Sequence, residues 1–508
     1  MANKSLKKNY IFNVTYQIIL LIAPLVTAPY ISRVLLAEGV GLYSFSYSIV
    51  SYFVLVATLG TTTFGQRAIS YVQNDKEARS RAFWELFIFR FILSVVTLVA
   101  YVPISLTVFH ENYLIYLILG LNVLNVAVDV TWFFQGLEDF GKTVFRNIIF
   151  KILSIVAIFI FVKEQSDLPW YVFFMVIFTI VGNMSLWLSL PKYICKVKEI
   201  KPFRDVKSIL KLFIPTIATQ VYLVLDKSMI GWFSADMAEN GYYEQAEKIA
   251  KMAMMVVTSL GAVMIPRISY MFKTGDMERV KYYLYKSYRF VWLMGVPITL
   301  GLIAVSSVFV PVFFGAGYEK CEILLPIFSS LVIFIGLSAV NGMQFFVPTG
   351  KENVLTLTVT VGAVVNLLLN LIMIPMFESL GACIATVVAE FSVTLVGFIY
   401  ISKTKSFKLK PIFLGSIKYW IAGIVMFGVI FLVKYFLEIN VITLIILIVI
   451  GIAVYSVMIL LLRDKFVLEL LFKVFGKLKR KKTVETGEIA EIISETVTSE
   501  NSENVDNQ

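Results

Sequence analysis

The chain has 508 residues and a net charge of +11, and 58% of its residues are hydrophobic whereas only 16% are charged. A soluble domain contains about 45–50% apolar and about 25% charged residues, so the composition excludes a water-soluble protein and predicts one that lives in a bilayer. One histidine and three scattered cysteines exclude a His-rich metal site, a zinc spacing and a disulfide framework. We therefore expect no metal and no cofactor.

Apolar runs separated by charged gaps predict fourteen membrane helices, and hence an all-α polytopic membrane protein. The expected ranges are 11–35, 40–64, 83–108, 112–136, 143–162, 168–190, 207–233, 242–266, 287–310, 321–347, 353–376, 379–402, 412–436 and 440–462. No small-residue cleavage site precedes the first run, so we expect that run to stay in the mature protein.

Lysine and arginine predict the orientation of these helices. If the N-terminus is cytoplasmic, the segments on that side hold 35 Lys and Arg residues and the external segments hold only 4. Positive charge accumulates in cytoplasmic loops, so we expect both termini in the cytoplasm. The net charge then reflects topology, and no nucleic acid partner is expected.

The loops and the tail carry little besides charge. The longest loop, 191–211, is basic and too short to form a soluble catalytic domain. The polar tail at 463–508 begins with a basic cluster at 477–482, expected to touch anionic lipid. Its last part, 483–508, holds seven acidic residues and no basic one, a composition typical of disorder.

The segment from Gly136 to Thr143 fits the letter pattern of a phosphate-binding loop, G-x-x-x-x-G-K-[ST]. That loop works between a strand and a helix, whereas this segment connects two predicted membrane helices. Glu138 and Asp139 also place negative charge where the phosphates of a nucleotide would lie. We interpret the match as chance.

Ionisable side chains inside the predicted helices are more informative, because such groups are costly in a membrane and usually face a cavity or a partner. In the eighth helix, Glu244 and Lys248, and likewise Glu247 and Lys251, are four residues apart and predict ion pairs within the helix. The alternative to a cavity role is an ion pair or a snorkelling chain that only orients a helix. We favour that alternative for Arg90, Lys151 and Lys418, and a cavity role for Asp129, Asp226, Lys227 and Lys251.

Short segments recur in the two halves of the chain. Gly41-x-Tyr43 follows the first expected helix and Gly241-x-Tyr243 follows the seventh. Internal repeats of this kind are typical of transporters.

Several segments resemble bacterial polysaccharide flippases of the Wzx type. They are Ala28–Leu35 followed by Gly39–Tyr43, Phe133–Glu138, and a second-half pattern of Asn366, Asn370, Pro375 and Gly381–Glu390. The resemblance spans roughly 5–465 and implies the fold of the multidrug/oligosaccharidyl-lipid/polysaccharide exporter superfamily. That fold implies two six-helix lobes around a central cavity, at 1–190 and 207–402, a basic linker at 191–206, and two further helices at 411–462.

The activity that the resemblance implies is transfer of an undecaprenyl-pyrophosphate-linked oligosaccharide from the inner to the outer leaflet of the bacterial plasma membrane. The implied partners are this lipid-linked oligosaccharide, membrane lipid, a polysaccharide polymerase and assembly proteins, and no enzymatic activity is implied. Without a nucleotide site, an ion gradient or the membrane potential is expected to drive net movement.

Two sets of site residues follow. Converging cations favour an anionic cargo, and the candidates for binding its pyrophosphate and sugars are Arg33, Lys227, Lys251, Asn122, Asn125 and Gln220. The candidates for carrying a coupling proton or sodium ion are the carboxylates Asp129, Asp226, Glu247 and Glu390.

Three alternatives are weighed against this hypothesis. An ion-coupled multidrug exporter of the same superfamily would have an acidic pocket for cationic drugs, and the cations count against it. A polytopic enzyme acting on a lipid-linked sugar would need a group such as His110 with Glu111 at the external face. A membrane scaffold without transport would not need charges at mid-membrane.

Overall fold

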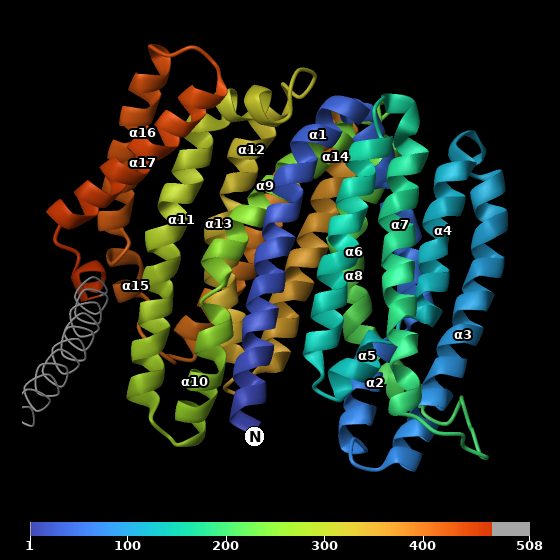
Figure 1. Cartoon of the computed structure of the whole chain (residues 1–508). Coiled ribbons are helices and arrows are strands. Elements are labelled where there is room, and N and C mark those ends of the chain that lie inside the picture. The colour runs from blue at the N-terminus through green and yellow to red at the C-terminus, as the bar shows by residue number, and fades with distance from the viewer. Residues whose placement is uncertain (1, 470–508) are drawn as a thin grey trace, which may run out of the picture.

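The structure is a computed structural model that describes residues 2–469. Some side chains within that range are not described, namely those of residues 2–18, 20, 21, 140, 214–216, 218, 219, 262 and 263. The predicted tail from 470 onward also lies outside the described residues. The described chain folds into helices with no β-strand, and the helices stand side by side in one bundle (Figure 1). The predicted all-α fold is confirmed.

The first half of the chain forms seven α-helices, which are the right-hand part of the bundle and its centre in Figure 1. They are α1 (Ala2–Thr58), α2 (Thr61–Tyr71), α3 (Lys76–Thr107), α4 (Tyr113–Val128), α5 (Thr131–Gly136), α6 (Phe140–Phe161) and α7 (Leu168–Ser185). Short 3-10 turns at His110–Asn112, Gln165–Asp167, Leu186–Leu188 and Leu190–Lys192 connect or extend them.

Between Val206 and Leu461 the second half forms ten α-helices and one π-helical segment. They are α8 (Val206–Phe233), α9 (Ala238–Thr258), α10 (Gly261–Lys273), α11 (Met277–Phe313), α12 (Cys321–Ser329), α13 (Leu331–Ala339), the π-helix Val340–Phe346, α14 (Glu352–Lys403), α15 (Lys410–Leu414), α16 (Ile417–Tyr435) and α17 (Val441–Leu461). In Figure 1, α16 and α17 lie at the left edge beside α11.

Two of the longest helices each contain one non-helical residue. In α1 this is Leu36, with φ 58° and ψ 178°, and in α14 it is Glu378, with φ 51° and ψ −126°. Both lie where the sequence predicts the end of one membrane helix and the start of the next. Lys320 binds Glu378 at 3.3 Å and Glu239 at 2.5 Å, and Glu239 also accepts hydrogen bonds from the backbone and the hydroxyl of Ser379, so the second break is fixed by ionic contacts.

Ten helical stretches in the described residues are long and apolar enough to cross a membrane. The chain is therefore a multi-pass membrane protein. Two of the ten are the broken helices α1 and α14, and α8 and α9 are not among them. The predicted count of fourteen thus stays a prediction.

Several predicted helices are interrupted in the structure, including the fourth (112–136), which breaks between Val128 and Thr131, and the two described next. The second, expected at 40–64, ends with Thr58 and resumes as α2 after Leu59 and Gly60, both at positive φ. The eighth, expected at 242–266, ends with Thr258, and α10 begins at Gly261. Both predictions were wrong in length, because apolar composition continues across a change in backbone direction.

The buried apolar side chains form separate clusters. One holds residues between 31 and 176, and another holds residues between 257 and 459. The contact between the halves runs largely along α1, which packs against α8 and α9. This arrangement agrees with the predicted two lobes, which remain a proposal.

The outer surfaces of α16 and α17 are apolar. Ile424, Leu432, Ile442 and Ile452 are each 60% exposed or more. Lipid tails are as apolar as these side chains, so no soluble partner is needed to cover them.

The predicted orientation can be tested by labelling. Cysteines introduced singly at residues 110, 165 and 378 are expected to react with an impermeant thiol reagent in whole cells, whereas cysteines at 200 and 406 are expected not to react. The reason is the 35-to-4 distribution of Lys and Arg between the two sides. Labelling at 200 from outside would overturn the topology.

Candidate functional site

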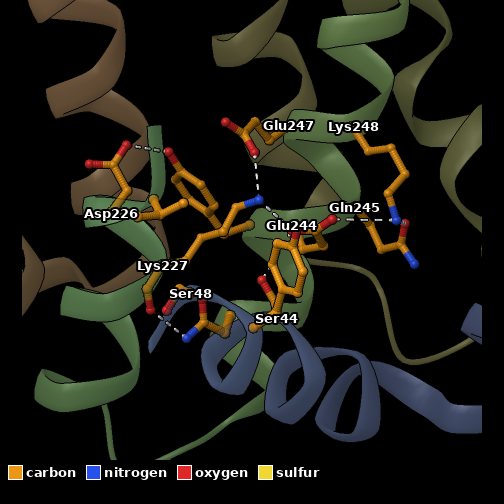
Figure 2. A network of polar contacts seen from close by, with 12 residues as sticks. Ser44, Ser48, Asp226, Lys227, Glu244, Gln245, Glu247 and Lys248 are labelled. Atoms are coloured by element: carbon orange, nitrogen blue, oxygen red, sulfur yellow. Dashed lines mark hydrogen bonds and ion pairs between the residues drawn. The ribbon is translucent and has the colours of Figure 1, made fainter. Parts of the chain in front are cut away.

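A cluster of ion pairs joins α8 to α9 near the middle of the bundle. The amine of Lys227, on α8, lies 2.5 Å from Glu244 Oε2 and 3.1 Å from Glu247 Oε2, both on α9. These three side chains are only 11–16% exposed. Figure 2 shows the Lys227 amine between the two carboxylates. Lys227 is thus enclosed by negative charge and oriented by it.

The two lysines on the following turn of α9 complete the cluster. Lys248 lies 3.5 Å from Glu244 Oε1, and Lys251 lies 2.6 Å from Glu247 Oε1, so both predicted pairs within the helix are confirmed. Lys251 is 44% exposed and Lys248 is 29% exposed. With three cations and two carboxylates, the cluster keeps a net positive charge, and its accessible members are cations.

Asp226 forms a second polar group next to the cluster. Its Oδ2 accepts hydrogen bonds from Tyr243 at 2.5 Å and Thr386 at 2.6 Å, and its Oδ1 accepts one from Asn370 at 2.6 Å. The predicted Asp226 thus lies buried among neutral donors from α9 and α14. Tyr243 and Thr386 could not be predicted from the sequence as its partners, although Asn370 belongs to the pattern that carries the family resemblance.

Hydroxyl groups of α1 tie the cluster to the other half of the chain. Ser44 donates a hydrogen bond to Glu244 at 3.0 Å, and Gln245 donates one to Ser32 at 2.9 Å. Ser228 donates to Ser48 at 3.0 Å, which Figure 2 places beside Ser44 on α1. The cluster therefore lies where the two halves meet, which no single apolar run could reveal.

Two glycines make that meeting close. A Cβ atom at Gly41 would lie 1.8 Å from the carbonyl oxygen of Met237, and one at Gly241 would lie 2.0 Å from that of Ala37. The contact is reciprocal. Gly41 faces Met237, four residues before Gly241, and Gly241 faces Ala37, four residues before Gly41. The glycines of the two repeated segments thus meet at one crossing of α1 and α9.

The structure places the other predicted residues in different ways. Glu390 accepts a hydrogen bond from Tyr222 at 2.8 Å, beside Asp226 in the second half. Gln220 is exposed on α8. Arg33 is exposed and donates to the carbonyl oxygen of Val312 at 2.6 Å, so it joins α1 to α11 away from the cluster.

The candidates on the fourth predicted helix lie within the first half and do not join the cluster. Asp129 ends α4, accepts two hydrogen bonds from Thr131 and lies 3.8 Å from Arg90. Asn125 accepts a hydrogen bond from Asn183 at 2.7 Å. Asn122 donates to the carbonyl oxygen of Leu119 in its own helix.

The cavities differ sharply in chemistry. One cavity, of about 680 Å³, lies between α11, α16 and α17 and is lined almost entirely by apolar side chains such as Met294, Ile298 and Ile452. A smaller one, of about 170 Å³, lies between α6 and α7 and contains Arg146 and Lys151. No group of three His, Cys, Asp or Glu side chains in the described residues could hold a metal ion.

A membrane bundle whose halves meet at a charged, partly accessible cluster is the architecture of a polytopic transporter. Comparison with known proteins agrees. Residues 6–272, more than half of the chain, match the family described as Polysaccharide biosynthesis protein. The chain belongs to this family, and the suspected resemblance is confirmed.

Individual proteins similar to this chain include a relative from Escherichia coli strain K12 that is named as an O-antigen transporter. The alignment is 25% identical over 414 positions and covers 79% of this chain and 98% of the relative. The Lipid II flippase MurJ of Bacillus subtilis is 20% identical over 465 residues, covering 81% of this chain and 85% of MurJ. Because these relatives are named as a transporter and a flippase, the prediction of a protein other than an enzyme is confirmed.

Solved structures show the same fold. A Lipid II flippase MurJ in an inward closed conformation superposes with a TM-score of 0.68 at 18% identity, covering 90% of this chain and 99% of that one. An inward-facing multidrug transporter of the MATE family gives a TM-score of 0.56 at 12% identity, covering 76% of this chain and 98% of that one. At these identities the likeness concerns the fold alone.

Proposed function

We propose that the chain is a flippase that carries an undecaprenyl-pyrophosphate-linked oligosaccharide from the inner to the outer leaflet of a bacterial plasma membrane. The observation that carries this proposal is the cluster at the junction of the halves, whose accessible members Lys248 and Lys251 are cations. The family match and the named relatives support the same class of cargo.

The chemistry of such a cargo explains why a protein is needed. A pyrophosphate and its sugars cannot cross hydrocarbon unaided, because unpaired charge and unsatisfied hydroxyls are expensive there. The polyprenyl tail is stable in lipid and need not be enclosed. A polar cavity between lobes at 1–190 and 207–402 would hold the head group while the tail stays in the bilayer, and alternating exposure to the two sides would complete the transfer.

Lys251 is the cation best placed to meet the pyrophosphate, because it is 44% exposed and has a single carboxylate partner. Lys227, the other predicted cation, has two carboxylate partners and is 16% exposed. We therefore assign Lys227 the role of fixing Glu244 and Glu247.

Net movement requires a source of free energy. The membrane potential supplies about 2.3 kcal/mol per charge for every 100 mV, and the carboxylates Asp226, Glu247 and Glu390 are candidates for carrying a coupling ion. Asp226 and Glu390 lie within one polar region, and each accepts a hydrogen bond from a hydroxyl. A hydroxyl can donate to a carboxylate or accept from a protonated carboxyl group, so both protonation states can be hydrogen-bonded. Asp129 lies outside this region, beside Arg90.

The test of this proposal is loss of the gene in a cell that makes a surface glycan. We expect surface glycan to disappear and the lipid-linked oligosaccharide to accumulate in the cytoplasmic leaflet, and expression of the full chain to reverse both effects. If the glycan stayed normal and the cell instead became sensitive to cationic drugs, the multidrug exporter would be the better assignment.

A further inference from the structure

The small cavity between α6 and α7 has a polar wall at membrane depth. From α6 it is lined by Arg146, Asn147, Lys151 and Ser154, which lie on one face of the helix, and from α7 by Thr179 and Asn183. None of its described lining residues is a carboxylate. The wall therefore offers cations, amides and hydroxyls, which are the groups that bind an anion.

Lys151 is the least satisfied of these groups. It lies about 15 Å from either end of α6, given a rise of about 1.5 Å per residue, so its half-buried side chain is near mid-membrane. Among the described residues its amine has no hydrogen bond or ion pair, and the charge that acts on it electrostatically belongs to another cation, Lys248 of α9. A cation in such a place is costly unless an anion joins it.

Arg146 lies nearer the N-terminal end of α6 in the same wall and is held in a fixed orientation. Its guanidinium donates to Asn183 Oδ1 at 2.7 Å and to the carbonyl oxygen of Gly182 at 3.2 Å, and it also donates to Asn147. Asn183 in turn donates to Asn125 at 2.7 Å. This network holds the positive charge of Arg146 in the wall of the cavity that Lys151 also lines.

The volume of the cavity limits its occupant. About 170 Å³ corresponds to roughly five or six water molecules at about 30 Å³ each. A single phosphate group fits such a space.

We propose that the cavity between α6 and α7 is a binding site for the phosphate ester of a lipid, with Lys151 as its principal cation. This inference rests on the proposed function and extends it, because it assigns the charged group of the cargo to a contact in the first half of the chain. Lys151 and Lys248 approach from the two halves, so one anion would be attracted to both.

Binding can be measured with the purified full chain in phosphatidylcholine nanodiscs, using farnesyl pyrophosphate as the probe and farnesol as the uncharged control. We expect Lys151→Gln to weaken pyrophosphate binding about tenfold, the value of one charge-assisted contact, and Lys151→Arg to retain most of it. The matched control is Lys418→Gln, on α16, whose amine donates only to the carbonyl oxygens of Leu462 and Arg463. Equal binding by Lys151→Gln and the unchanged chain would overturn the proposal.

Folding is monitored in the same variants. Since Lys151 faces a like charge, Lys151→Gln is expected to leave the melting temperature unchanged or higher. A large decrease would mean that Lys151 supports the fold, and would overturn the proposal. Ser154→Ala provides a second variant that trims the same wall without changing charge, and should weaken probe binding severalfold.

The two sources of a phosphate ester are separated by two further arms. If the lipid-linked cargo is the ligand, Lys151→Gln lowers surface glycan in cells, and phosphatidylglycerol in the nanodiscs does not displace the probe. If phosphatidylglycerol displaces the probe and the variant exports glycan normally, the site serves a phospholipid head group and the assignment to cargo is overturned. If probe binding depends on Lys151 but loss of the gene leaves the surface glycan unchanged, the binding site is upheld and the proposed function is refuted.

Discussion

Replacing Gly41 or Gly241 by alanine is expected to reduce glycan export about fivefold or more while leaving the protein in the membrane. Each added methyl would meet a backbone carbonyl oxygen, at 1.8 Å for Gly41 and 2.0 Å for Gly241, and backbone cannot rotate aside as a side chain can. Overpacking costs about 1–3 kcal/mol, and a bias of that size shifts an equilibrium between two conformations by about 5–150-fold.

The affected conformation is the one in which α1 and α9 cross closely. That crossing also aligns Ser44 with Glu244 and Ser32 with Gln245, so separating the helices breaks contacts that join the halves. In the proposed alternating-access mechanism this junction would form and part, and a chain that could no longer form it would lose one of its two states.

The measurement is surface glycan per amount of inserted protein. Gly428→Ala is the matched control, because a Cβ at Gly428, within membrane helix α16, would meet no atom within 4 Å. Normal export by both Gly41→Ala and Gly241→Ala would show that the crossing is not required for transport.

These glycines illustrate what the sequence contains and what it does not. The similarity of Gly41-x-Tyr43 to Gly241-x-Tyr243 is visible in the letters, and it predicts a repeat. That the two segments face each other, each against the other's backbone, depends on how the halves dock. Local pattern can mark such residues, but only tertiary structure brings them together.

The same limit applies to the charges. Pairs four residues apart, such as Glu244 with Lys248, follow from helix geometry and could be predicted. The contacts of Lys227 with Glu244 and Glu247 join two helices, so no spacing along the chain reveals them. Asp129 looked equivalent to Asp226 in the sequence, yet it caps α4 beside Arg90.

Backbone breaks were predicted where composition changes and missed where it does not. The boundary between the first two predicted helices lies at Leu36, whose positive φ no propensity would suggest for leucine. The break before Gly261 falls within a continuous apolar run, so hydropathy alone extended the eighth helix too far.

Lys227→Gln is expected to lower the amount of inserted protein, because Glu244 and Glu247 lose the buried cation between them and keep only Lys248 and Lys251, which are more exposed. Removing one partner from a buried ion pair costs about 3–5 kcal/mol, a large share of the stability of most proteins. Adding Glu244→Gln in the same chain should restore much of the protein, since the neutral pair leaves no carboxylate uncompensated there.

Lys251→Gln is expected to behave differently, although both lysines contact Glu247. Lys251 is 44% exposed, and without it Glu247 still has Lys227 at 3.1 Å, so abundance should be nearly normal while glycan export falls about tenfold. Lys251→Arg should retain much of the export, because phosphate accepts either cation. Inserted protein and surface glycan are measured together in each variant. If Lys251→Gln instead lowers abundance, and Glu247→Gln in the same chain restores it, then Lys251 supports the fold, and the cations of this cluster do not bind the cargo.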